Sequence, residues 1–141
     1  MRIKSLLGTL MAVALGMAST AAHAQVVVII STKNPISKLT ADQVTQIFLG
    51  EAKTFYSGGM AVPLDLSEGG AKATFYEKVM GKSPAQLKAY WSKMTFSGRA
   101  QPPESLADPK SLVKKVAENP KYIGYVDKSA VNPSVKIVMA L

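Results

Sequence analysis

Residues 39–75 read LTADQVTQIFLG, EAKTFYSGGMA and VPLDLSEGGAKATF, and this stretch decides the fold class of the chain. Thr40 followed three residues later by Gln43 is typical of a capping box, in which each residue satisfies a backbone N–H of the other at a helix start. Apolar residues then recur at helical spacing as far as Phe48, and Gly50 is a typical helix stop. The first third of the stretch therefore predicts a short amphipathic helix.

The remainder of the stretch predicts a strand, a tight turn and a second helix. Ala61–Leu66 has the composition of a strand, and an apolar helical pattern runs from about Ala71 to Met80. A glycine-bearing turn between a strand and a helix leaves backbone N–H groups directed at solvent, which is how many proteins bind anions. The residues that we expect to contact such an anion are Ser67, Gly69, Gly70, Ala71 and Lys72.

The rest of the chain continues the alternation of strands and helices. Val26–Ile30 is an unbroken β-branched run, which is typical of a strand buried on both faces, as in parallel sheets. Further helices are predicted from Pro84 to about Met94 and from Pro109 to about Asn119, with a loop from Phe96 to Asp108 between them. The predicted final strands are Tyr122–Val126 and Val135–Met139. This alternation indicates a single α/β domain.

The first 24 residues have the pattern of a secretory signal peptide. Arg2 and Lys4 precede an uncharged, mainly apolar run, and Ala22-His23-Ala24 is a small-x-small cleavage site. The alternative, a permanent membrane anchor, fits less well because the run is rich in small residues and falls short of the ~20 strongly apolar residues that a span needs. We expect cleavage after Ala24, a mature domain of residues 25–141 in the periplasm, and no stable membrane insertion afterwards.

Composition excludes several kinds of catalysis in that mature domain. The chain has no cysteine, and its single histidine, His23, leaves with the predicted signal. Ser-His-Asp and Cys-His catalysis, histidine-ligated zinc and disulfides are therefore excluded. We expect no catalytic residue, no metal site and no cofactor.

The charge balance of residues 25–141 is basic. Once Arg2 and Lys4 are set aside, 15 of the 17 lysines and arginines remain against nine acidic residues. Proteins that bind nucleic acids rely on arginine and exposed aromatics, whereas here the lysines are scattered and Arg99 is the only arginine. We therefore expect no nucleic-acid partner. A solvated lysine-rich surface and a general attraction for small anions both fit.

Three landmarks occur in order along the mature chain. Asn34-Pro35 follows the first strand, a helix ends in Ile-Phe-Leu-Gly at residues 47–50, and the segment Asn119-Pro-Lys-Tyr-Ile-Gly-Tyr125 comes near the end. With these landmarks the chain resembles the phosphate-type periplasmic substrate-binding proteins of ABC transporters. The resemblance implies one lobe of a type II periplasmic-binding-protein fold, with a mixed, mostly parallel sheet flanked by helices. Full-length relatives have a second lobe, most of which we expect to be missing here.

The residues that hold the anion in that family are mostly replaced. The family places a Ser-Gly-Thr loop four residues ahead of a helix phenylalanine; counted back from Phe75, that loop falls on Gly69-Gly70-Ala71. Six residues before the threonine position the family has an arginine, and this chain has Asp65. A carboxylate at that place would repel a phosphate. Ser67 and Lys72 are the residues available to compensate in part.

Several of these residues also have purely structural interpretations. Ser31 and Thr32 are further candidate ligand-binding residues, grouped with the 67–72 turn, because they end the first strand, where parallel sheets place ligands. Polar turn residues are, however, expected there anyway. The 67–71 loop also fits a tight connection without a ligand, and Asp65 fits a simple ion pair with Lys33 or Lys72. The aromatic residues at 90, 91 and 96 fit core packing better than a platform for a partner.

Three functions remain open from the sequence. The first is a solute-binding module for phosphate or a similar small anion, connected with ABC-type transport or sensing. The second is a periplasmic interaction or sensor module that has lost phosphate binding, whose partner is an ABC permease or another periplasmic protein. The third is an enzyme, which the absence of histidine, cysteine and a metal cluster argues against.

Overall fold

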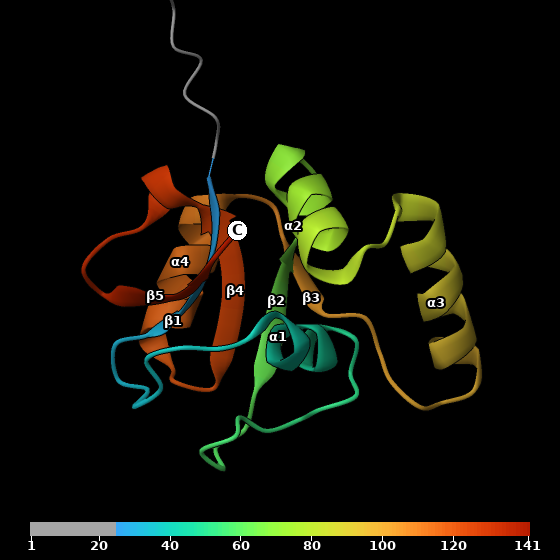
Figure 1. Ribbon diagram of the computed structural model, residues 1–141, viewed down its shortest axis with the longest axis horizontal. Coiled ribbons are helices and arrows are strands. Elements are labelled where there is room, and N and C mark those ends of the chain that lie inside the picture. The colour runs from blue at the N-terminus through green and yellow to red at the C-terminus, as the bar shows by residue number, and fades with distance from the viewer. Residues whose placement is uncertain (1–24) are drawn as a thin grey trace, which may run out of the picture.

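The computed structural model describes residues 25–141 (Figure 1), so the predicted signal peptide lies outside the described residues. Strands and helices alternate along these residues, as the sequence predicts. In chain order the elements are β1 (Val26–Ser31), α1 (Ala41–Phe48), β2 (Val62–Leu66), α2 (Gly70–Met80), α3 (Pro84–Phe96), β3 (Glu104–Leu106), α4 (Pro109–Glu118), β4 (Tyr122–Asp127), a 3-10 turn (Lys128–Ala130) and β5 (Val135–Ala140).

The five strands form one mixed sheet in the order β3-β2-β4-β1-β5. Strand β2 is parallel to β3 and β4, whereas β1 is antiparallel to β4 and β5. All six residues of β1 are buried, as its β-branched run predicts. The expectation of parallel neighbours for β1 was wrong, because burial on both faces depends on the helices that cover the sheet and not on strand direction.

Helices cover both faces of the sheet. Helix α4 packs against β4 and β1 on one face, and α1 and α2 pack together on the other (Figure 1). Gly124 in β4 lets α4 approach closely, since a Cβ atom at Gly124 would lie 2.6 Å from Leu112. On the opposite face the rings of Phe75 and Tyr125 stack with their centroids 4.1 Å apart. The core is thus continuous through the sheet.

The helix caps follow the sequence. Thr40 and Ser83 both form capping boxes, with Gln43 and Gln86 respectively. Gly81 ends α2 in the left-handed conformation, with φ of 62°. Each of these residues satisfies backbone groups that a helix end would otherwise leave without partners.

Two features of the 84–108 region differ from the sequence expectation. The predicted loop contains β3, which pairs with β2 in parallel. Helix α3 continues to Phe96 and lies beyond α2, away from the sheet (Figure 1). Its Trp91 is 9% exposed and belongs to the core, as predicted. The expectation of core packing was wrong for Phe96, the last residue of the helix, which is 96% exposed. In the part of the chain described, no helix is long and apolar enough to cross a membrane.

Candidate functional site

The turn between β2 and α2 leaves the start of α2 open to solvent. Gly69 is the N-cap residue, with φ of 112°, and it offers no side chain to bond the first N–H groups of the helix. Ser67, Gly69 and Gly70 are exposed, and no acidic residue lies in the first turn. The first N–H groups of a helix have no partner within the helix, and together they carry part of the positive end of the helix dipole. This start of α2 can therefore attract an anion.

Asp65 lies directly beneath this turn, near the end of β2, and is 5% exposed. The hydroxyl of Tyr76 in α2 donates a hydrogen bond of 2.6 Å to its Oδ2 atom. The hydroxyl of Tyr125 in β4 donates to its Oδ1 atom, and the N–H of Leu66 donates to the same oxygen at 2.8 Å. These contacts join β2, α2 and β4 through one carboxylate.

This environment raises the pKa values of the phenols of Tyr76 and Tyr125. Burial, followed by the charge of Asp65 and the hydrogen bond to it, raises the pKa of Tyr76 far above its ordinary value. The pKa of Tyr125 is raised for the same reasons, again with burial as the largest cause. Both phenols therefore remain protonated donors to Asp65 at any neutral pH, which keeps the carboxylate paired.

Lys72 lies in the first turn of α2, whereas Lys82 follows the C-terminal end of that helix. The Nζ atom of Lys72 lies 3.7 Å from Oδ2 of Asp65, which confirms one of the two ion pairs that the sequence suggested. Next to it is a cavity of about 210 Å³. Its wall is mainly apolar, and the residues that line it are Gly69, Lys72, Ala73, Tyr76, Lys82, Pro84 and Leu87. Two lysines thus border one small cavity that extends from the open helix start along α2.

Ser31 and Thr32 lie at the opposite end of the sheet. Strand β1 is antiparallel to β4, and Ile30 pairs with Ile123 near the beginning of β4, whereas the 67–72 turn follows the end of β2. A strand of six residues spans about 20 Å, so Ser31 and Thr32 do not share a small-molecule site with that turn. The Ser31 hydroxyl is buried and donates to the carbonyl of Ala117. Lys33 belongs to the same distant end and forms no ion pair with Asp65.

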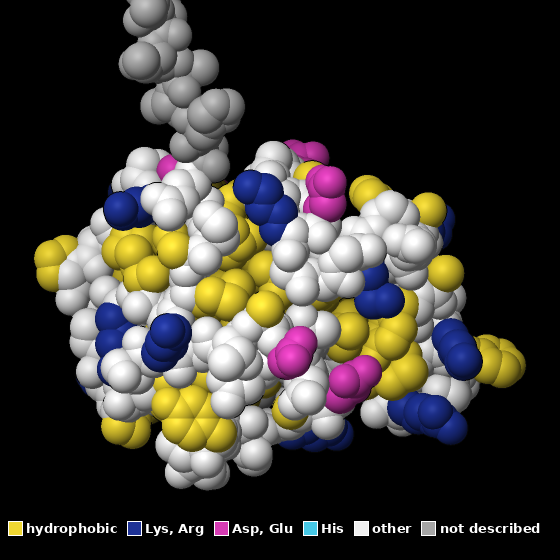
Figure 2. Space-filling model, viewed as in Figure 1, with side chains coloured by type: hydrophobic (Ala, Val, Ile, Leu, Met, Phe, Trp, Pro, Cys, Tyr) yellow, Lys and Arg dark blue, Asp and Glu magenta, His cyan; other side chains and the backbone are white. Residues whose placement is uncertain are grey.

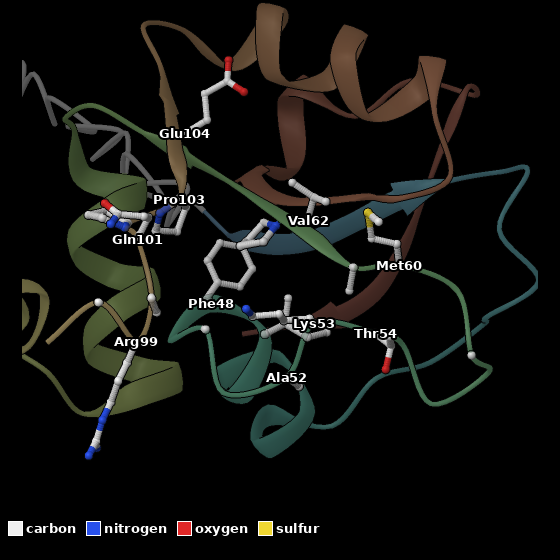
Figure 3. Close-up of a pocket in the computed structure, with 18 residues that line it drawn as sticks. Phe48, Ala52, Lys53, Thr54, Met60, Val62, Arg99, Gln101, Pro103 and Glu104 are labelled. Carbon is white, nitrogen blue, oxygen red and sulfur yellow. The ribbon is translucent and has the colours of Figure 1, made fainter. Parts of the chain in front are cut away.

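A larger groove lies on another part of the surface, between the end of α1, the 50–60 loop, the start of β2 and the 98–104 segment. Its volume is about 810 Å³. The side chains of Phe48, Val62 and Pro103 lie around it, while that of Arg99 extends away from it (Figure 3). Met60 at its border is 62% exposed. Sequence reasoning did not identify this groove, because its wall combines four segments that are individually ordinary.

The sequence also gave no indication of Tyr76 and Tyr125 as partners of Asp65. They lie 11 and 60 residues away along the chain, and no local pattern connects them. Lys82 was missed for the same reason, since only the turn of the chain after Gly81 brings it to the wall of the cavity that Lys72 also lines. Over residues 25–141 no cluster of acidic, histidine or cysteine side chains has the arrangement of a metal site.

Comparison with solved structures shows what kind of fold this is. An ABC-type phosphate transport receptor from Vibrio cholerae matches 82% of this chain with a TM-score of 0.63 and 19% identity. A substrate-binding protein assigned to a phosphate ABC transporter of Clostridium perfringens, solved with bound phosphate, matches 81% with a TM-score of 0.62 and 22% identity. PstS from Borrelia burgdorferi matches 81% with a TM-score of 0.55 and 16% identity. The α/β fold is therefore that of one lobe of a phosphate-type substrate-binding protein.

This chain spans 44–46% of the length of these three solved proteins. No protein-family model matches it, and no curated protein is similar to it in sequence. The likeness thus concerns the fold alone.

Proposed function

We propose that the chain is a periplasmic binding module of the substrate-binding-protein type that holds a small anion, phosphate or a similar oxyanion, at the start of α2. The observation that carries this proposal is the uncapped, exposed first turn of α2 beside a cavity bordered by Lys72 and Lys82. The protein acts as a binding protein in ABC-type transport or sensing and not as an enzyme. The phosphate bound to the Clostridium perfringens protein supports the choice of ligand class.

Asp65 makes this binding weak. Its carboxylate lies where the resemblance expects an arginine, and Lys72 at 3.7 Å offsets its charge only in part. The turn is exposed as well, so water competes for every hydrogen bond to the ligand. We expect a dissociation constant on the order of 1 mM, which corresponds to about 4 kcal/mol of binding free energy.

A thermal-shift titration of residues 25–141 tests the proposal. With a Kd of about 1 mM, 10 mM phosphate should stabilise the protein by about 1.4 kcal/mol, or roughly 5 °C for a domain of this size. The ligands are phosphate, sulfate, molybdate and small carboxylates, each compared with chloride at equal ionic strength. No shift at 10 mM with any of them would refute anion binding.

Two lysine variants locate the site. Lys72→Gln should remove most of the ligand-dependent shift, whereas Lys78→Gln, in the last turn of the same helix, should leave it unchanged. Both variants remove one positive charge, so the comparison separates a local contact from general attraction. A shift that survives in Lys72→Gln would place the anion elsewhere.

A second function is favoured by the groove of about 810 Å³ and by the exposed Met60 beside it. Here the module would dock a periplasmic partner or an ABC permease through an apolar surface and would not respond to anions. A photo-crosslinking residue in place of Met60 should then capture one defined partner in cells, and the same residue in place of exposed Ser57 should not. Equal labelling at both positions would argue against this function.

A further inference from the structure

The net positive charge of the described chain is concentrated in residues 78–103, the α3 arm, which contains α3. Between Glu77 and Glu104 the sequence has no acidic residue. The basic residues in this interval are Lys78, Lys82, Lys88, Lys93 and Arg99. They supply five of the six net positive charges of residues 25–141, so the remainder of the domain is almost neutral. The charge of the domain is therefore unevenly distributed. An anionic surface would orient the domain so that the α3 arm faces that surface.

The outward side of α3 combines this charge with an exposed aromatic ring. Leu87 and Trp91 face the core, so the opposite side of the helix faces solvent. Lys93 lies three residues before Phe96 and therefore neighbours it on the helix surface. Lys88 and Phe96 border the same shallow hollow. At the α3 end of the molecule Figure 2 shows basic and hydrophobic side chains and no acidic ones.

We infer that the α3 arm is a docking surface for an anionic lipid membrane, with Phe96 entering the headgroup region and the lysines lying over the lipid phosphates. The ring of Phe96 is 96% exposed, so its transfer out of water lowers the free energy of the system. Lysines near an anionic bilayer each add to the attraction, and an aromatic residue with basic neighbours is the pattern of interfacial binding. Attachment of this kind is peripheral, since no helix in residues 25–141 is able to span a bilayer.

The composition of the arm favours a lipid surface over an acidic protein. Four of its five basic residues are lysines, and protein interfaces are depleted in lysine and enriched in arginine. The lysines are also spread along residues 78–93 and not gathered around one pocket. A spread of point charges suits a fluid layer of phosphates, which needs no fixed geometry, better than a folded partner.

Co-sedimentation of residues 25–141 with vesicles tests this inference. The protein should bind vesicles that contain equal amounts of phosphatidylglycerol and phosphatidylethanolamine at 20 mM salt, and it should bind pure phosphatidylcholine at least tenfold more weakly. Raising the salt to 300 mM should release it. Failure to bind the anionic vesicles at low salt would overturn the inference.

Matched variants show whether the arm is responsible. Lys88→Glu with Lys93→Glu should lower binding by about 25-fold or more, at roughly fivefold for each lysine. Lys38→Glu with Lys128→Glu changes the net charge by the same amount on exposed residues outside the arm, and it should lower binding by less than about threefold. An equal loss in both pairs would mean general attraction and would overturn the assignment.

A third comparison tests the aromatic contact. Phe96→Ser should weaken vesicle binding about fivefold to tenfold, whereas Tyr56→Ser, at an aromatic residue that is 63% exposed outside the arm, should have little effect. Unchanged binding in Phe96→Ser would overturn the insertion of the ring. Capture on polyglutamate beads that equals vesicle binding and ignores Phe96→Ser would overturn the lipid assignment in favour of an acidic polypeptide.

Discussion

The buried carboxylate of Asp65 gives a quantitative prediction through the variant Tyr76→Phe. The substitution keeps the ring, which contacts Phe75 edge to face at 5.2 Å between centroids, and removes only the hydroxyl. That hydroxyl donates 2.6 Å to a carboxylate that is 5% exposed. Hydrogen bonds to charged groups contribute about 1.5–3 kcal/mol, so we expect unfolding free energy to fall by that amount.

The background Asp65→Asn separates the charge from the hydrogen bond. In that background the Tyr76 hydroxyl meets a neutral amide, and neutral hydrogen bonds contribute only about 0.5–1.5 kcal/mol. The same Tyr76→Phe change should therefore cost about 1 kcal/mol less there than in the wild-type protein. This difference is the coupling energy of a double-mutant cycle, which isolates the pair from the other contacts of Asp65.

Urea unfolding monitored by the fluorescence of Trp91 measures these free energies, since Trp91 is the only tryptophan and is buried. Tyr56→Phe is the control, because its hydroxyl is exposed and should change stability by less than about 0.5 kcal/mol. A loss below 0.5 kcal/mol for Tyr76→Phe, or an equal loss in both backgrounds, would refute a charged hydrogen-bonded cluster.

Two further predictions concern pH and packing. The raised pKa values of Tyr76 and Tyr125 mean that the unfolded phenols ionise near pH 10 while the folded ones do not. Stability should therefore be intact below pH 10 and fall above it by up to about 2.7 kcal/mol per pH unit, and constant urea midpoints from pH 9 to 11 would contradict this. Gly124→Ala should cost about 1–3 kcal/mol, because its Cβ would meet Leu112 at 2.6 Å. Gly70→Ala has open space and should be neutral or slightly stabilising; similar losses in both variants would show that the close approach of α4 is not the cause.

Local signals in the sequence were enough to predict most of the elements. The capping residues Thr40 and Ser83 correctly predicted the starts of two helices, and the β-branched run at 26–30 correctly predicted a buried strand. Each of these signals lies within a few residues of the structure that it determines. Strand β3 was missed because Glu104–Leu106 is only three residues long and mostly exposed, so its pairing with β2 depends on tertiary contacts.

The candidate site was predictable only where it is local. The turn at 67–72 and its open helix start follow from glycines next to a strand, and Lys72 was identified as the partner of Asp65. The chemistry beneath the turn depends on Tyr125, which a different strand supplies 60 residues later. Ser31 was grouped with the turn because β1 was expected to run parallel to its neighbours, and its antiparallel pairing places Ser31 at the other end of the sheet.

The pairing of β1 has a consequence for how the chain folds while it is being made. The first strand of residues 25–141 pairs only with β4 and β5, the last two, so that Val26 lies opposite Asp127 and Val27 opposite Ala140. Contacts so distant along the chain form slowly, and β1 has no partner strand until β4 and β5 have been synthesised. Strand β1 therefore stays unpaired until late in synthesis. For a protein with a predicted export signal this delay is useful, because secretion channels that thread single chains accept them only before they fold.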